Sequence, residues 1–212
     1  MTKIADNIAA LKKQMGSKTT LVAVSKQQPE DRIDAALAAG QRVFGENRVQ
    51  EAEERWISRR PSYADLSLHL IGPLQTNKVR DAVALFDVIE TLDRVKLADA
   101  IAAEITAQGR KISCYVQVNT GDEEQKAGVS LGELPMLLEH CRAIGLAVDG
   151  LMCIPPVDEP SGLHFALLKK LSQDHGLKNL SMGMSDDFEK ALRLGATHVR
   201  IGTGVFGNRE KA

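Results

Sequence analysis

The sequence predicts a single α/β domain of the eight-stranded parallel (β/α)8 barrel class, spanning residues 1–212. Short runs rich in β-branched residues alternate along the chain with longer segments whose apolar residues recur at helical spacing. Eight such runs can be counted, and eight parallel strands is the number that closes a barrel. No Pro-rich or Gly-rich linker divides the chain, and 43% apolar content supports one sizeable core. An open doubly wound sheet is the structural alternative.

The predicted strands are short and share a high content of Val, Ile and Leu. They cover residues 20–24, 41–44, 67–71, 86–89, 112–118, 146–151, 177–181 and 197–201. Six of the eight are followed directly by a polar residue or a glycine, as expected for strands that run into a loop at the same end of a sheet.

Amphipathic segments between the strands predict helices. They include residues 29–39, 48–58, 94–108, 131–143 and 186–194. Gly40, Gly145 and Gly195 each follow a helical segment and precede a strand, where a left-handed helix cap is favoured. A further helix at about 3–15 precedes the first strand and is extra to the repeat.

Charge and composition exclude several classes of function. The 27 Lys and Arg residues balance 28 Asp and Glu residues, so no basic surface for nucleic acid or an anionic membrane is indicated. No stretch approaches the ~20 apolar residues of a membrane helix, and no leader is evident, so we expect a cytoplasmic protein. The three cysteines and five histidines lack the spacing of a metal site or a disulfide framework. Without a long unsatisfied apolar face, we expect a monomer.

Lys26 is the first candidate site residue, because it follows an apolar strand at the end of the barrel where sites are built. Partial desolvation there would favour the neutral amine, which attacks a carbonyl to form an imine. The alternative is a solvated lysine at a strand terminus.

Two loops after the last two strands predict an anion site. Ser185 is a candidate N-cap of the following helix, and the run of residues 200–204 supplies Arg200, Thr203 and glycines that let backbone N–H groups approach a ligand. Barrels usually hold phosphate after strands seven and eight, so a phosphate beside a reactive amine suits a phosphorylated aldehyde. Alternatively, the glycines only shape turns and Arg200 pairs with a carboxylate.

Six segments, in this order, resemble the pyridoxal 5'-phosphate (PLP) homeostasis proteins, also called the YggS/PROSC family. The resemblance covers residues from about 23 to 207. The segments are Ala23-Val-Ser-Lys26, Phe44-Gly-Glu-Asn-Arg-Val-Gln-Glu51, His69-Leu-Ile-Gly-Pro-Leu-Gln-Thr-Asn-Lys78, Gly150-Leu-Met-Cys-Ile-Pro-Pro156, Leu180-Ser-Met-Gly-Met-Ser-Asp-Asp187 and His198-Val-Arg-Ile-Gly-Thr-Gly-Val-Phe-Gly207.

The resemblance implies a fold-type III PLP barrel, similar to the amino-terminal domain of alanine racemase. PLP would be held as a Schiff base on Lys26, with Ser185, Gly202 and Thr203 at its phosphate. Arg200 would lie either at the phosphate or near the pyridine nitrogen, and the remaining residues would line the pocket. The cofactor-binding residues that the resemblance implies are Lys26, Asn47, His69, Met182, Ser185, Arg200, Gly202 and Thr203.

Two departures from the family pattern stand out. Gly204 replaces an expected Ala, which we expect to loosen the loop, and Cys153 replaces an Ala that is common before Ile-Pro-Pro.

A family member is expected to carry or buffer PLP in vitamin B6 homeostasis, with apo PLP-dependent enzymes as acceptors and no established turnover. The rival is a small PLP-dependent amino acid racemase. That reaction needs a second acid/base opposite the lysine, which alanine racemase takes from a second domain, whereas this sequence ends at Ala212. Tyr63 lies in a loop-like stretch and Tyr115 in a strand, where a core role is favoured.

A third hypothesis is a sugar-phosphate isomerase or aldolase in which Lys26 meets a sugar carbonyl and Glu46 or Asp93 moves the proton. Acidic residues at such positions are more often caps or solvated surface. The Glu46, Glu51, Glu53 and Glu54 cluster near two arginines is accordingly interpreted as a solvated helix face.

Overall fold

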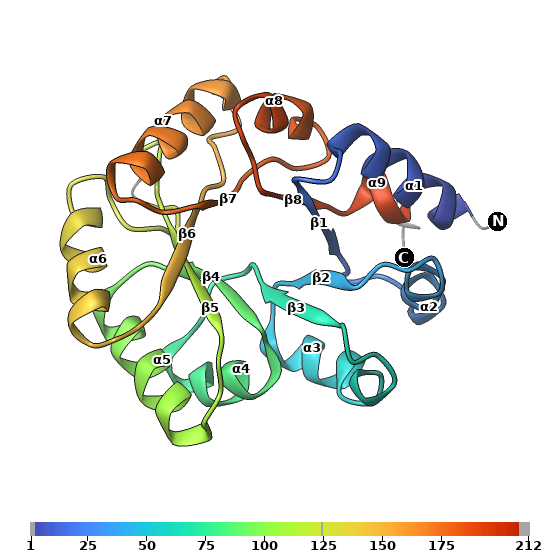
Figure 1. Ribbon diagram of the computed structural model, residues 1–212, viewed down its shortest axis with the longest axis horizontal. Helices are drawn as coiled ribbons and strands as arrows, with labels where there is room; N and C mark the ends of the chain where they lie inside the picture. The colour runs from blue at the N-terminus through green and yellow to red at the C-terminus, as the bar shows by residue number, and fades with distance from the viewer. Residues whose placement is uncertain (1–2, 124, 208–212) are drawn as a thin grey trace.

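The computed structural model of the chain describes residues 3–123 and 125–207. Its strands form a closed parallel barrel in chain order, which confirms the predicted fold class and excludes an open doubly wound sheet (Figure 1). All eight predicted strands are present, with ends shifted by a few residues. They are β1 (Thr20–Val24), β2 (Val43–Glu46), β3 (Ser67–Leu70), β4 (Val88–Leu92), β5 (Ser113–Gln117), β6 (Val148–Met152), β7 (Asn179–Ser181) and β8 (His198–Ile201).

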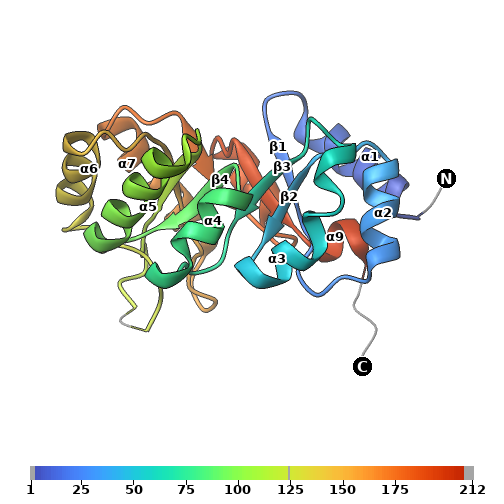
Figure 2. The same ribbon diagram turned by 90° about the horizontal axis from the view of Figure 1, so that it is seen from below.

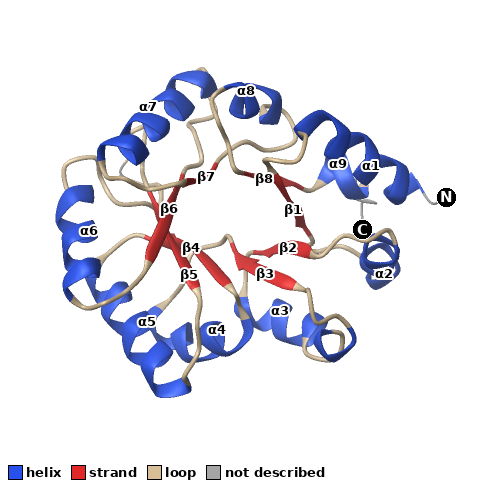
Figure 3. Cartoon of the chain, in the orientation of Figure 1, coloured by secondary structure: helices blue, strands red, loops and turns tan. Residues whose placement is uncertain are grey.

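Helices surround the ring of strands (Figure 3) and flank it when the barrel is seen from the side (Figure 2). Gly40, Gly145 and Gly195 have φ of 80°, 71° and 93°, as predicted for left-handed positions after helices. No helix among the described residues is both long and apolar enough to cross a membrane. The α-helices are α1 (Lys3–Met15), α2 (Glu30–Ala38), α3 (Val49–Trp56), α4 (Val79–Leu85), α5 (Val95–Gln108), α6 (Leu134–Ala143), α7 (Ser161–Asp174), α8 (Phe188–Arg193) and α9 (Thr203–Phe206).

The apolar core lies mainly between the strands and the surrounding helices. Phe44 on β2 and Trp56 on α3 are fully buried there, with ring centroids 4.6 Å apart. The three cysteines are buried and free, as the sequence predicts. Inside the barrel, Val88, Tyr115 and Met152 form a separate, smaller apolar cluster, so much of the interior is left to polar groups.

Pairing of β1 with β8 closes the barrel, with Ala23 opposite Ile201. This register brings the residues that follow β1 beside those that follow β8. Helix α1 supports the junction from outside, because its Asn7 Nδ2 donates a hydrogen bond of 3.0 Å to the Val205 carbonyl of α9. The helix that lies outside the repeat therefore holds the segment after β8 in place.

Candidate functional site

Lys26 occupies a tightly turned segment just beyond β1. Its side chain is partly buried. Gln27, the next residue, has a left-handed φ of 57°, and the Gln28 backbone N–H donates to the Ser25 carbonyl at 3.1 Å. A non-glycine residue with positive φ is uncommon and has to be held by its surroundings. The backbone of Lys26 is thus constrained on both sides.

The residues after β7 and β8 lie beside the end of β1, two residues before Lys26. Thr203 Oγ1 donates to Ser185 Oγ at 2.9 Å, which joins the two loops. A Cβ on Gly202 would lie 3.6 Å from Val24 Cβ, so this glycine packs against the end of β1. Three predicted cofactor residues therefore lie at the end of the barrel that Lys26 follows, and their two hydroxyls and glycine backbone form a donor set that suits a phosphate.

Ser185 does not cap helix α8, contrary to the sequence prediction. The helix begins at Phe188 with Asp187 in the cap position, and Asp187 Oδ1 accepts a 2.7 Å hydrogen bond from the Met184 backbone N–H. Asp187 thus takes the cap position, and the Ser185 hydroxyl contacts Thr203 instead.

Gly204 allows close packing rather than a loose loop. A Cβ at this position would lie 2.7 Å from Ile201 Cγ2, a distance at which one group has to move. Glycine in place of the expected Ala therefore lets α9 pack closely against the end of β8.

A chain of buried polar groups crosses the barrel interior beneath the rim. Arg200 Nη1 donates to Ser181 Oγ at 2.7 Å, and Ser181 Oγ donates to Glu90 Oε2 at 2.5 Å. The other carboxylate oxygen of Glu90 lies 2.6 Å from Nδ1 of His69. Arg200 also donates to the Cys153 carbonyl at 2.8 Å. Arg200 is only 4% exposed and Glu90 fully buried, so the barrel encloses two opposite charges.

The charges around Glu90 keep its carboxylate ionised. Burial alone would raise its pKa, but the hydrogen bond and charge of His69, together with the charge of Arg200, outweigh burial and lower the pKa below its usual value. Buried ionised groups need such partners, because an uncompensated charge is costly in a medium of low dielectric constant.

His198 is the second imidazole of the interior and is half-buried. Its Nε2 lies 3.4 Å from the Tyr115 hydroxyl, and its ring centroid lies 5.7 Å from that of His69. Burial, with smaller contributions from His69 and Arg200, lowers the pKa of His198 to about 4, against an opposing effect of Glu90.

This shift predicts acid sensitivity. Since the folded pKa of about 4 lies below the ordinary 6.5, the unfolded chain takes up the proton first as the pH falls. Stability contributed by neutral His198 should be complete above pH 6.5 and should decrease towards pH 4, by up to about 3 kcal/mol. Urea unfolding across this range measures the effect. His198→Gln should flatten the slope; an equally steep slope in that variant would contradict the assignment.

The remaining predicted pocket residues lie in three different places. His69 is in the barrel interior, as part of the Glu90 chain. Asn47, at the end of β2, borders a groove of about 570 Å³ between the loops that follow β2 and β3. Met182 directly follows β7 and is fully buried in the core between strands and helices, whereas Met184 is 40% exposed. Met182 remains a predicted pocket residue.

Sequence analysis missed or misjudged four polar residues of the barrel strands. Glu90 was absent from the predicted set because the fourth strand was expected to end at residue 89, whereas β4 continues to Leu92. His198 and Ser181 were not proposed as members of a polar network. The available signal was the alternation along the strands, which points these residues into the barrel. Glu46 was interpreted as solvated but is fully buried.

Gly183 in the loop after β7 should resist substitution. It has φ of 93°, and an added Cβ would lie 2.6 Å from Ala191 Cβ. We expect Gly183→Ala to lower the free energy of unfolding by about 2–4 kcal/mol, from left-handed strain plus overpacking. Gly195 is a matched control, since it has the same φ of 93° and its nearest contact would be 3.9 Å away. Chemical denaturation of Gly183→Ala and Gly195→Ala measures the difference. Equal losses of stability in the two variants would show that the contact with Ala191 is not responsible.

The fold and the position of the lysine define the class of this chain. Residues 1–210 match the family model described as alanine racemase, N-terminal domain. A solved structure of PipY from Synechococcus elongatus PCC7942 without PLP superposes with a TM-score of 0.90 at 37% identity, covering 97% of this chain and all of that one. The PLP-bound structure of the same protein has a TM-score of 0.85 at 36% identity with the same coverage.

A curated relative gives the narrower assignment. The pyridoxal phosphate homeostasis protein of Pseudomonas aeruginosa is 39% identical over 228 aligned positions, which cover 99% of this chain and 97% of the relative. The chain belongs to the family of pyridoxal phosphate homeostasis proteins. Relatives in this family are named for homeostasis rather than for a catalysed reaction.

Proposed function

We propose that this protein binds PLP as an imine on Lys26 and carries or buffers the cofactor for apo PLP-dependent enzymes. The observation that carries the proposal is the β1–β8 junction. The strand before Lys26 pairs with the strand before Gly202 and Thr203, and Thr203 is bonded to Ser185. This pairing supports a single site that binds both the aldehyde and the phosphate of one ligand. The PLP named in the bound PipY structure supports the same chemistry for this barrel.

We further propose that Arg200 lies at the pyridine ring and that the phosphate is held at the rim. This is supported by the burial of Arg200 inside the barrel, where it donates to Ser181 and to the Cys153 carbonyl, below the Ser185–Thr203 hydroxyl pair. Bound PLP supplies an electron-withdrawing ring for amino acid chemistry. A cation such as Arg200 disfavours protonation of a nearby ring nitrogen and so weakens that property, which suits a carrier.

The racemase alternative lacks a suitable second acid/base among the two tyrosines. Tyr115 is 3% exposed, and burial raises the pKa of its hydroxyl, so the group stays protonated within the interior cluster. The guanidinium of Arg42 lies over the ring of Tyr63, with Cζ of Arg42 4.8 Å from the centroid of that ring. Since Arg42 precedes β2, that contact lies at the opposite end of the barrel from Lys26.

The sugar-phosphate alternative loses both of its acid/base candidates. Glu46 is fully buried and bonded to Arg55 and Trp56 behind the strand. Asp93 forms an ion pair of 2.5 Å with its neighbour Arg94. These contacts favour structural roles for both carboxylates.

The test begins with absorption spectra of the purified protein titrated with PLP, followed by borohydride reduction and peptide mapping. We expect an imine band and one reduced adduct on Lys26. The holo-protein should then activate an apo PLP-dependent enzyme faster than an equal concentration of free PLP. A folded protein without an imine band would overturn the cofactor assignment. An imine without faster transfer would limit the function to storage. Sedimentation of the holo-protein tests the monomeric state that we propose.

A further inference from the structure

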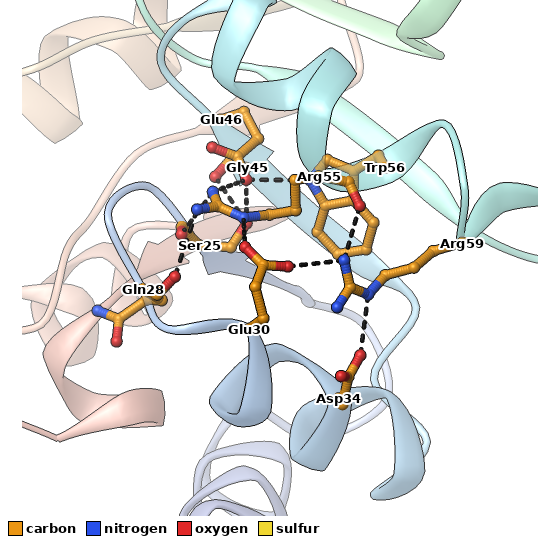
Figure 4. A network of polar contacts seen from close by, with 9 residues as sticks. All are labelled: Ser25, Gln28, Glu30, Asp34, Gly45, Glu46, Arg55, Trp56 and Arg59. Atoms are coloured by element: carbon orange, nitrogen blue, oxygen red, sulfur yellow. Dashed lines mark hydrogen bonds and ion pairs between the residues drawn. The ribbon is translucent and has the colours of Figure 1, made fainter.

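A second buried ion pair lies outside the barrel wall, in contact with Ser25, the residue before Lys26 (Figure 4). Glu46, the last residue of β2, points away from the barrel interior towards helix α3, and its side chain is fully buried. Arg55 of α3 pairs with it at 2.8 Å and has a side chain only 10% exposed. Neither residue is among the proposed cofactor contacts. Apolar side chains in place of a buried ion pair often stabilise a fold equally well, so the presence of this pair points to a role other than stability.

Three donors converge on one oxygen of Glu46. Oε1 accepts from the Ser25 hydroxyl at 2.7 Å, from Arg55 Nη1 at 2.8 Å and from Trp56 Nε1 at 3.0 Å. Two of these donors come from α3 and the third from the residue immediately before Lys26. The carboxylate therefore ties the end of β1 to the helix that follows β2.

Arg55 also binds the turn that contains Lys26 through its backbone. Nη1 donates to the Ser25 carbonyl at 3.0 Å, and Nη2 donates to the Gln28 carbonyl at 3.3 Å. These carbonyls belong to the residue before Lys26 and to the second residue after it. The guanidinium thus spans the turn, and its planar fork is suited to holding two acceptors in a fixed relation.

The turn needs such support, because Gln27 within it adopts a left-handed φ of 57°. A conformation of this type persists only where surrounding contacts enforce it. The charge of Arg55, which holds this turn, is itself stabilised by neighbouring carboxylates. Burial would lower the pKa of Arg55, but Glu46 and, to a smaller extent, Glu30 raise it overall, so the guanidinium stays charged.

We propose that Ser25, Glu46 and Arg55, here called the turn clamp, are positioning residues that fix the Lys26 backbone so that its amine meets the PLP aldehyde while the phosphate is bound at the rim. The inference rests on the proposed function, since it assigns a role in imine formation. The clamp acts through the turn and contacts no cofactor atom.

The outer part of the same network provides a matched control. Arg59 pairs with Glu30 at 2.7 Å and with Asp34 at 2.8 Å, and these two carboxylate side chains are 55% and 59% exposed. Arg59 makes a further bond to the Arg55 carbonyl, and the three partners Glu30, Asp34 and Arg55 all lie outside residues 25–28. Arg55 lies in the last turn of α3 and Arg59 lies three residues beyond its end, so Arg55→Lys and Arg59→Lys are the same substitution with and without contact to the turn.

The experiment compares these two variants with the wild type in three measurements. The PLP dissociation constant and the pH midpoint of the imine band report on the site. Hydrogen exchange of a peptide covering residues 25–28, in protein without PLP, reports on the turn itself. Since a lysine cannot reach Glu46 and both carbonyls at once, we expect Arg55→Lys to weaken PLP binding by about tenfold or more. It should also shift the pH midpoint and speed exchange in the turn, whereas Arg59→Lys should stay within about twofold of wild type.

Each outcome decides the question. A wild type without a reducible imine on Lys26 defeats the proposed function, while the exchange data still test whether the clamp holds the turn. If the wild type forms the imine and Arg55→Lys leaves the PLP affinity, the pH midpoint of the imine band and the exchange rate of the turn unchanged, the turn clamp is overturned. If Arg55→Lys fails to fold, Ser25→Ala takes its place. It removes one bond to Glu46, and it should give a smaller shift in the same three measurements; no shift in any of them would also overturn the clamp.

Discussion

Lys26→Ala should abolish the imine band and leave no borohydride-reducible adduct. The fold should survive, because Lys26 is only partly buried at the end of β1 and the turn clamp does not use its side chain. PLP would retain contacts with the hydroxyls of Ser185 and Thr203, so binding should become weaker and noncovalent. We expect a loss of roughly 100-fold in affinity, equivalent to ~2.8 kcal/mol.

Absorption spectra, fluorescence titration and peptide mapping after reduction measure this result, with circular dichroism as the check on folding. Lys78→Ala is a suitable control, since Lys78 lines the groove beside Asn47 after a neighbouring strand. That variant should keep the band. A reducible band that persists in Lys26→Ala and maps to another lysine would refute the assignment of the imine.

Glu90→Gln should cause a large loss of stability. The amide preserves the shape of the side chain but removes the negative charge, and Arg200 then remains 4% exposed without its counter-charge. Breaking a buried charge pair from one side typically costs about 3–5 kcal/mol; because Ser181 separates the two groups, we expect about 3 kcal/mol. For a chain of this size that corresponds to a fall in melting temperature of roughly 6–12 °C.

A double-mutant cycle distinguishes lost charge compensation from simple damage to packing. Adding Arg200→Met to Glu90→Gln removes both charges, and part of the lost stability should return. Glu189→Gln, on the exposed surface of α8, should change the free energy of unfolding by less than about 0.5 kcal/mol. If the stability that the double variant loses relative to the wild type equals the sum of the two single losses, Glu90 does not act by compensating Arg200.

Local sequence predicted the strands well, because the properties that define a strand end lie within a few residues. β-Branched runs identified all eight strands, and glycines after helical segments identified left-handed caps. Lys26 and Gly202 could be selected because the carboxyl ends of parallel strands meet at one rim, a consequence of the fold class alone.

Side-chain environment was harder to predict. Glu46 precedes a helix rich in acidic residues and carries no local sign that a tryptophan and an arginine will bury it. Ser185 has the composition of an N-cap, yet the neighbouring Asp187 takes that position. Met182 and Met184 flank one glycine, and only the direction of the chain leaving β7 decides which of them is buried.

The sequence by itself determined the number and order of strands and the rim at which a reactive lysine and a phosphate-type loop would face one another. Only the tertiary structure decided that Glu90 contacts Ser181, which is 91 positions away, and that Glu46 and Arg55 hold the Lys26 turn. The reason is physical. Strand periodicity and turn preference arise from local backbone sterics, whereas the burial and partners of a charge depend on elements that meet only when the barrel closes.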